Sequence, residues 1–213
     1  MKECLFGMFN SDLDEKNVFK IVEEKLKEKY NTSFVVKKIG NRYGTGKYDE
    51  ATLFCSPSHD KNMVFTVTYN MVNKFIVSDD YYIKTSCAEL EKQIDKNLKN
   101  SVTKVELFGK NISSKAYSIR EIIDEYPNCK YIITTVSNEK IDVNVFNEIL
   151  NNIKNTYNGI SAKVLLYVAS KDDFAEIQKE AEMVPELSEA YIEKHNVSKQ
   201  YIIDIKDNNI MYL

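Results

Sequence analysis

The feature that most constrains the fold is a run of short apolar segments joined by very short polar turns. In the clearest segment, 63–69, every second residue is large and apolar, as in a strand with one buried face. The joins at 56–60 and 70–73 are too short for a parallel crossover. The sequence therefore predicts a four-stranded antiparallel meander. Its strand candidates are 34–39, 51–55, 63–69 and 75–77.

A helix is predicted on each side of this meander. Ser11 and Asp14 can form a capping box, and the apolar residues that follow recur every fourth position until Asn31 ends the pattern. A second helix is expected to begin at Ser86, which forms a capping box with Glu89. Residues 11–100 are thus predicted to form a helix–sheet–helix unit.

The remaining residues have a different rhythm, in which strand candidates alternate with helices. Strand starts about thirty residues apart are typical of βαβ units. Pro185 is expected to end one helix, with 186–195 forming a separate helix or a kinked continuation, and 208–209 to form a terminal hairpin turn. We therefore predict an α+β protein with an α/β unit over 101–213, packed against 11–100. The strand candidates of this second unit are 105–108, 131–136, 164–168 and 201–205.

Composition excludes several classes of function. A net charge of −3 without a basic stripe argues against a nucleic-acid partner. The sequence contains no run of eighteen apolar residues, so it predicts no transmembrane helix. Two histidines exclude a His-rich metal site, and the four scattered cysteines contain no CxxC pair. We expect no metal or other cofactor and a reducing, cytoplasmic setting, while oligomeric state stays undetermined.

The segment 40–48 approaches a phosphate-binding loop but departs from it at two points. The first glycine, Gly40, comes one residue too early, and Tyr48 replaces the hydroxyl residue that would hold magnesium. The next element reads as a strand, whereas phosphate binding needs a helix N-terminus. A contact surface or a plain hairpin connection remains, because Tyr and Arg are favoured at interface hot spots. The candidate contacts are Arg42, Tyr43, Lys47 and Tyr48.

Cys55 and His59 are the nearest approach to a nucleophile and its base. Catalysis would need a third group to orient the histidine, and the adjacent Asp60 rarely aligns for that role. We interpret the pair as a buried strand thiol beside an exposed turn histidine. His195 lies near a predicted helix end, where a histidine often only favours the helix dipole.

Paired carboxylates occur at 79–80 and 172–173. The pair Asp172 and Asp173 follows a strand and opens a helix, where α/β sheets commonly bind ligands, and Glu139 follows the preceding strand in the same way. Helix caps need the same residue types. A small-molecule crevice at these strand ends is therefore one hypothesis, without a GxGxxG, GxSxG or HExxH motif to name its chemistry.

Several segments of the first unit carry a family resemblance. Arg42-Tyr43-Gly44, Cys55-Ser56-Pro57, Val64-Phe65-Thr66-Val67 and Asp80-Tyr81-Tyr82 resemble a group of uncharacterised proteins of low-GC Gram-positive bacteria. Some members look like lipoproteins. The resemblance covers about residues 14–100 and implies no known activity, but it implies that a precursor could carry a lipid anchor, which would place the protein outside the cytoplasm.

Two functions stay open at this point. A non-catalytic binding or protein-interaction module is favoured, because the residue types that carry chemistry are scarce or scattered along the chain. The alternative is a small-molecule binder or enzyme that uses a crevice at the C-terminal ends of the second unit's strands, near Glu139, Asp172 and Asp173.

Overall fold

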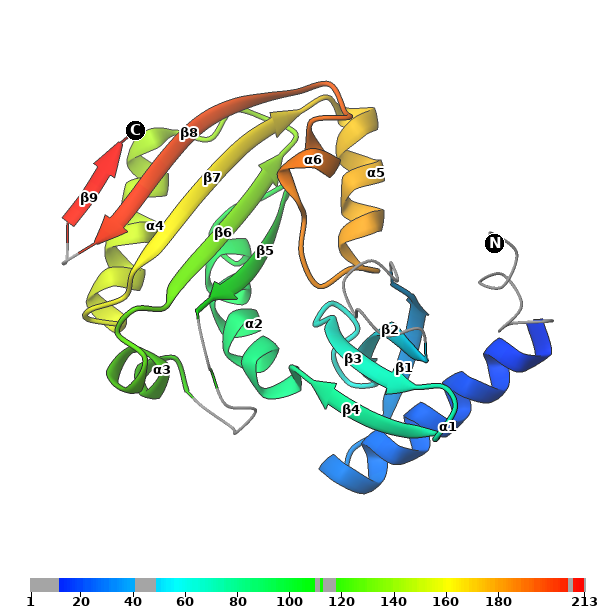
Figure 1. Ribbon diagram of the computed structural model, residues 1–213. Helices are drawn as coiled ribbons and strands as arrows, with labels where there is room; N and C mark the ends of the chain where they lie inside the picture. Colours follow the sequence, from blue (N-terminus) through cyan, green and yellow to red (C-terminus); the bar gives the residue numbers. More distant parts are fainter. Residues whose placement is uncertain (1–11, 41–48, 110–111, 113–117, 207–208, 213) are drawn as a thin grey trace, which may run out of the picture. The chain divides into compact units, whose positions relative to one another are not determined.

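The computed structural model describes residues 12–40, 49–109, 112, 118–206 and 209–212. The chain divides into two compact units, residues 1–80 (unit 1) and 81–213 (unit 2). Figure 1 labels their helices and strands. Unit 1 contains α1 (Asp12–Tyr30), β1 (Phe34–Ile39), β2 (Glu50–Pro57), β3 (Phe65–Asn70) and β4 (Phe75–Asp79). Unit 2 contains α2 (Tyr81–Asp95), β5 (Ser101–Phe108), α3 (Ile119–Glu125), β6 (Lys130–Ser137), α4 (Val143–Thr156), β7 (Ala162–Ala169), α5 (Lys171–Ala181), α6 (Glu189–Ile192), β8 (Val197–Lys206) and β9 (Asn209–Tyr212).

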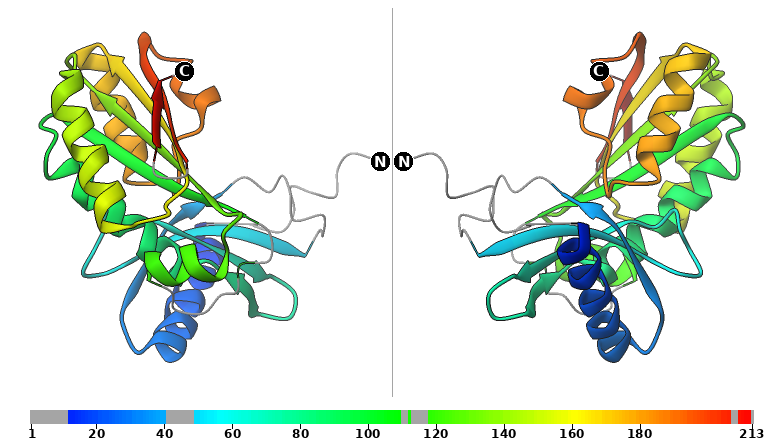
Figure 2. Two further views of the ribbon diagram at one scale, coloured as in Figure 1. Left: turned by 90° about the vertical axis from the view of Figure 1, so that its left-hand side faces the viewer. Right: turned by 90° about the vertical axis from the view of Figure 1, so that its right-hand side faces the viewer.

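Unit 1 is an antiparallel meander in the order β1-β2-β3-β4, which confirms the prediction from its short turns. Helix α1 contacts both outer strands, β1 and β4, and so crosses one face of the sheet (Figure 2). The core between them includes Val22 and Leu26 of the helix and Val67 of the sheet, all with no exposed surface. The four-residue apolar repeat of the helix thus packs on the alternating face of the strands.

The two edges of this sheet differ. At β1, the backbone N–H of Val36 donates to the Glu23 carboxylate of α1 at 2.9 Å. This contact satisfies an edge group that could otherwise pair with another strand. At β4, one residue, Val77, is extra to the pairing with β3, and the only elements with substantial contacts to the strand among the described residues are β3 and α1.

Unit 2 has a five-stranded sheet in sequence order, β5-β6-β7-β8-β9. The alternation of strands and helices is confirmed, but only β6 and β7 are parallel; β5 pairs with β6, and β7 with β8, in antiparallel fashion. The predicted terminal hairpin is present as β8–β9. A single βαβ unit, β6–α4–β7, therefore lies at the centre of an otherwise antiparallel sheet.

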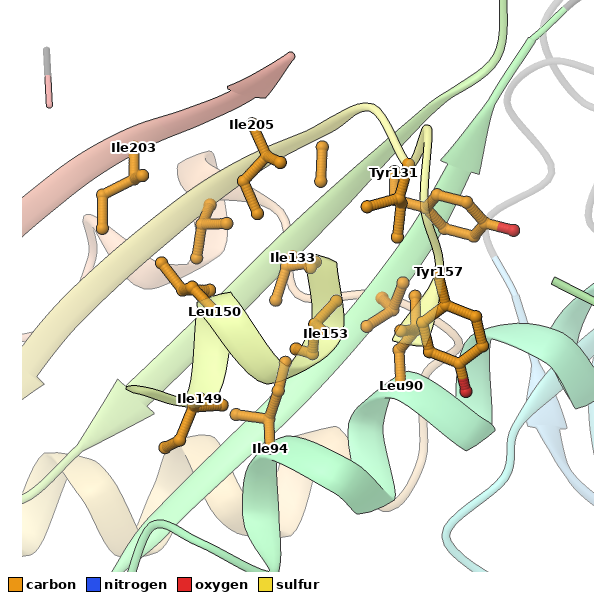
Figure 3. Close-up of a cluster of buried hydrophobic side chains, with 14 of the residues drawn as sticks. Leu90, Ile94, Tyr131, Ile133, Ile149, Leu150, Ile153, Tyr157, Ile203 and Ile205 are labelled. Carbon is orange, nitrogen blue, oxygen red and sulfur yellow. The ribbon is translucent and has the colours of Figure 1, made fainter. Parts of the chain in front are cut away.

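Helices cover both faces of this sheet. On one face, α2, α3 and α4 enclose the larger core, in which Leu90, Phe146 and Leu150 pack on Val164 and Leu166 of β7. Figure 3 shows part of this core, with Leu90, Leu150 and Ile133. On the other face, α5 and α6 pack on the alternate residues of the same strand, including Leu165 and Tyr167. The apolar run 164–168 of β7 is explained by burial on both faces.

Helix α2 runs along the edge strand β5 and satisfies its backbone. The N–H of Val105 donates to Glu91 at 2.8 Å, and the ammonium of Lys84 donates to the carbonyl of Val105 at 3.1 Å. The same ammonium donates to the carbonyl of Pro185 at 3.1 Å, so this buried lysine also ties the segment between α5 and α6 to the sheet edge. Burial raises the pKa of Glu91, and the cations of Lys104 and Lys84 oppose this rise.

Three boundaries differ from the sequence-based expectations. Helix α2 begins at Tyr81 and not at Ser86, whose buried hydroxyl donates to the carbonyl of Ile83 within the helix instead of capping its start. The helix expected over 186–195 is only Glu189–Ile192. The expected domain boundary at 100/101 lies twenty residues beyond the division at 80/81, since α2 packs on β5 and belongs with unit 2.

Candidate functional site

The contact loop that the sequence singles out falls outside the described residues. Arg42, Tyr43, Lys47 and Tyr48 all lie in the segment 41–48. Its first flanking residue, Gly40, is described: its backbone N–H donates to the carbonyl of Thr52 at 2.8 Å. A methyl group on Gly40 would lie 2.8 Å from the Phe54 ring, so the glycine leaves room for this side chain of β2.

Cys55 and His59 do not form a catalytic pair. Cys55 is fully buried in β2, and burial, with the carboxylates of Glu23, Asp79 and Asp80, raises the pKa of its thiol. A thiol held in the neutral form is a poor nucleophile. His59 lies on the exposed turn after β2. The interpretation of a buried strand thiol beside an exposed histidine agrees with this geometry.

The carboxylates of Asp79 and Asp80 both hold unit 1 together. Asp79 is buried and accepts from the Lys29 ammonium at 2.7 Å and the Tyr30 hydroxyl at 2.5 Å. Asp80 accepts from the backbone N–H of Thr66 at 2.5 Å. These contacts connect the end of α1 and β3 to the end of β4, which is a structural role.

Glu139, Asp172 and Asp173 lie at one edge of the unit 2 sheet, because β6 and β7 are parallel and end there. They belong to segments on opposite faces, however. Glu139 precedes α4 and accepts from the Asn100 side-chain amide at 3.1 Å. Asp172 and Asp173 form the first turn of α5, which packs on the other face.

Asp173 is the centre of a hydrogen-bonded group that includes a serine and a histidine. The Ser170 hydroxyl donates to one carboxylate oxygen at 2.5 Å, and Nδ1 of His195 lies 3.2 Å from the other. The hydrogen bond from Ser170, together with the backbone N–H of Asn196 and His195, lowers the pKa of Asp173.

This group resembles a catalytic triad in composition but not in order. In a triad the histidine lies between the hydroxyl and the carboxylate, so that it can take the hydroxyl proton. Here the carboxylate of Asp173 lies in the middle, and Ser170 is the N-cap of α5, whose hydroxyl accepts from the Asp173 backbone N–H at 3.2 Å. The arrangement caps a helix and links α6 to α5, and the histidine bonds the carboxylate rather than the serine.

A cavity of about 640 Å³ lies near the same edge of the sheet, beside the N-terminus of α4. Its lining is mixed: a loop with polar side chains on one side and strand residues on the other. Glu139, Asp172 and Asp173 are not among the lining residues. The lining residues are Lys140, Ile141, Asp142, Val143, Asn144, Val168, Ser198, Lys199, Gln200 and Tyr201.

Gln200 fixes the loop that forms one wall of this cavity. Tyr201 pairs with Leu166 and Lys199 with Tyr167, so Gln200 is an extra residue that bulges from β8. Its side-chain amide donates to the carbonyl of Ile141 at 2.8 Å, and its oxygen accepts from the N–H of Ile141 at 3.3 Å. Sequence reasoning missed Gln200; the available signal was a polar residue directly before the apolar run 201–205.

Metal chemistry has no support within the described parts of the chain, where no group of three or more His, Cys, Asp or Glu side chains could hold an ion. Of the helices described, none has the length and apolar character required to cross a bilayer.

Comparison with known proteins adds one structural relationship. Neither a family model nor a curated protein matches this sequence. The chain is similar to a solved structure, the crystal structure of a DUF5037 family protein from Ruminococcus gnavus ATCC 29149, with a TM-score of 0.69 and 14% sequence identity. The similarity covers 91% of this chain and 94% of that one. The TM-score shows that the two proteins share a fold, and at 14% identity the similarity extends to the fold alone.

Proposed function

We propose that this protein is a non-catalytic protein-interaction module and that the edge strand β4 of unit 1 is one of its contact surfaces. The observation that carries the proposal is a group of large apolar side chains exposed on and beside this strand. Val72 is 59% exposed, Phe75 46% and Val77 42%. Exposed apolar side chains that cluster on one element mark interaction surfaces more often than isolated ones do.

The contrast between the two sheet edges supports this choice. At the β1 edge, the Glu23 side chain accepts a hydrogen bond from the backbone N–H of Val36. At the β4 edge, the elements with substantial contacts to the strand among the described residues are only its neighbour β3 and α1. An uncovered edge strand can pair with an extended segment of another protein. The partner we propose is therefore an extended peptide segment with apolar residues at alternate positions, which would pack on Phe75 and Val77.

The loop that contains Arg42, Tyr43, Lys47 and Tyr48 is included in the proposed surface as a second contact region, on the strength of its residue types. We place the protein in the cytoplasm, without a nucleic-acid partner or cofactor. The alternative location is the membrane surface, through a lipid anchor on a precursor, as the lipoprotein-like resemblance implies.

The other function we keep is a small-molecule binder or enzyme at the strand ends near Glu139, Asp172 and Asp173. Its support is that the parallel strands β6 and β7 bring the segments after them to one edge of the sheet. It predicts a ligand-dependent rise in melting temperature that an Asp173→Ala variant loses.

Affinity capture from the protein's own cells, with soluble and membrane fractions kept separate, tests the interaction proposal. We expect one stoichiometric protein that is captured by the wild type and lost with Phe75→Asp or Val77→Asp. Val145→Asp is the matched control, because Val145 is 44% exposed on α4 in unit 2. Arg42→Ala and Tyr43→Ala should weaken capture without unfolding. Equal capture by the β4 variants and the control would refute β4 as the contact surface.

A further inference from the structure

The cavity beside α4 is built on a rigid frame. The double hydrogen bond between Gln200 and Ile141 fixes the 140–144 loop to β8. The side chain of Asp142 caps α4 by accepting from the N–H of Asn144 at 2.7 Å. Loop, strand and helix start are thus fixed without a ligand. A preformed cavity of this size is in the range of small-molecule sites, about 300–1,000 Å³.

The charges in the lining do not select an anion. Lys199 lies within 3.8 Å of Glu189 and above the Tyr167 ring at 5.4 Å, and both contacts involve residues of the α5–α6 face. The charged side chains left to the cavity are Lys140 and Asp142, which are of opposite sign. Phosphate sites usually gather several donors of positive charge, and this lining does not.

The uncharged groups of the lining are suited to hydroxyl groups. The side-chain amide of Asn144 and the hydroxyl of Ser198 can each donate and accept. Tyr201 supplies a half-buried aromatic ring, and Val168 an aliphatic patch. Groups that both donate and accept match vicinal hydroxyls, and aromatic and aliphatic surfaces match the C–H faces of a sugar ring.

From these features we infer that the cavity between the 140–144 loop and β8 binds a neutral, hydroxyl-rich small molecule of the size of a mono- or disaccharide. This site is independent of the interaction surface on β4 and of the carboxylates of Glu139, Asp172 and Asp173. The role that we assign to this site is binding, since the lining carboxylate, Asp142, is engaged in capping α4.

The test is an NMR titration of the full chain, labelled with ¹⁵N, against four probes: glucose, maltose, glucose 6-phosphate and leucine. We expect glucose or maltose to shift the amide signals of 140–144 and 198–201 in a saturable manner. Glucose 6-phosphate should bind no more tightly than glucose, and leucine should leave these signals unchanged.

Two asparagines of α4 provide matched variants. Asn144→Ala removes a lining amide whose side chain is exposed, and Asn152→Ala removes an exposed amide of the same helix away from the cavity. We expect at least a five-fold loss of saccharide affinity in the first variant and no change in the second.

Three outcomes would overturn the inference. Shifts by leucine or glucose 6-phosphate without glucose or maltose would show a different ligand class. No saturable shift with any probe at millimolar concentration would remove the cavity as a saccharide site. Equal loss in both asparagine variants would place binding elsewhere.

Discussion

Tyr157 offers the sharpest test of how unit 2 is held together. It follows α4, and its hydroxyl lies between two side chains of α2: it donates to Glu89 at 2.6 Å and accepts from the Gln93 amide at 2.8 Å. The ring is 7% exposed and belongs to the larger core, where Figure 3 shows it beside Leu90. Tyr157→Phe removes the hydroxyl and keeps the ring.

The expected loss of unfolding free energy depends on how exposed Glu89 and Gln93, the two hydrogen-bond partners of Tyr157, are to water. A hydrogen bond to a charged group contributes about 1.5–3 kcal/mol and a neutral one about 0.5–1.5 kcal/mol. Glu89 is exposed and Gln93 half-buried, so both can regain water in the variant. We therefore expect the low end of these ranges, a loss of about 1–2 kcal/mol in the free energy of unfolding.

Tyr69 of β3 is the matched control, with the opposite expectation. Its side chain is 1% exposed, and its hydroxyl has no hydrogen-bond partner among the described residues. Removal of a buried, unsatisfied hydroxyl relieves a desolvation penalty. Tyr69→Phe should thus leave the free energy of unfolding unchanged or raise it by up to about 1 kcal/mol.

Urea unfolding followed by circular dichroism measures both variants, provided that the slope against urea stays the same. A stability of Tyr157→Phe equal to that of the wild type would refute the reasoning, as would a loss in Tyr69→Phe as large as the loss in Tyr157→Phe.

The hydrogen bond between Tyr157 and Glu89 also predicts how the stability of the protein depends on pH. Burial, reinforced by the hydrogen bond to Glu89, raises the pKa of Tyr157 to about 12. An unfolded tyrosine ionises near pH 10, so the stabilisation is complete below about pH 10 and is lost as pH rises to about 12. The difference between the wild type and Tyr157→Phe should therefore narrow over this range, and a constant difference would contradict the assignment.

Three further predictions concern the helix caps, the sheet edge and a turn. The pKa of Asp173 is lowered, so its stabilisation of the fold is present above the ordinary aspartate pKa and is lost as pH falls. Asp173→Asn should therefore lower the melting temperature at neutral pH, and the difference in melting temperature from the wild type should shrink in acid. A difference that does not change with pH would contradict this prediction. Glu91→Ala should lower the free energy of unfolding by about 3 kcal/mol, because it leaves the N–H of Val105 without its acceptor and removes a carboxylate from beside two buried lysines. Glu91→Gln keeps an acceptor for this N–H, so its loss of unfolding free energy in the same urea assay should be smaller. Lys74 has a φ of 55° in the turn before β4, so Lys74→Gly should raise stability by about 0.5–1 kcal/mol; a loss would show that the lysine side chain contributes more than the strained backbone costs.

The sequence predicted most of the fold where local patterns carry the information. The bounds of β1 were predicted at both ends, since an alternating apolar pattern between turn residues is a local signal. Gly159 has a φ of 88° two residues after the cap of α4, a left-handed position that glycine adopts without strain and that is a local signal for the end of a helix. The start of α2 was wrong because Ser86 followed by Glu89 satisfies the capping pattern inside a helix as well as at its start.

Strand direction and the cavity depended on contacts that no local pattern encodes. Alternating helices and strands suggested several βαβ units, but β5 and β6 are antiparallel although α3 separates them. The cavity lining joins residues some sixty positions apart, through the hydrogen bonds of Gln200 to Ile141. A bulge in β8 directs this contact, and bulges leave little trace in a single sequence.

The order of the strands has a consequence for synthesis of the chain. In both sheets each strand pairs with the strand that precedes it in the sequence, from β1 to β4 and from β5 to β9. Pairing between sequence neighbours gives low contact order, which favours rapid folding. As the chain leaves the ribosome, each new strand finds its partner already present. Unit 1 can therefore form while most of unit 2 is still being translated, and the sheet of unit 2 can grow strand by strand from β5.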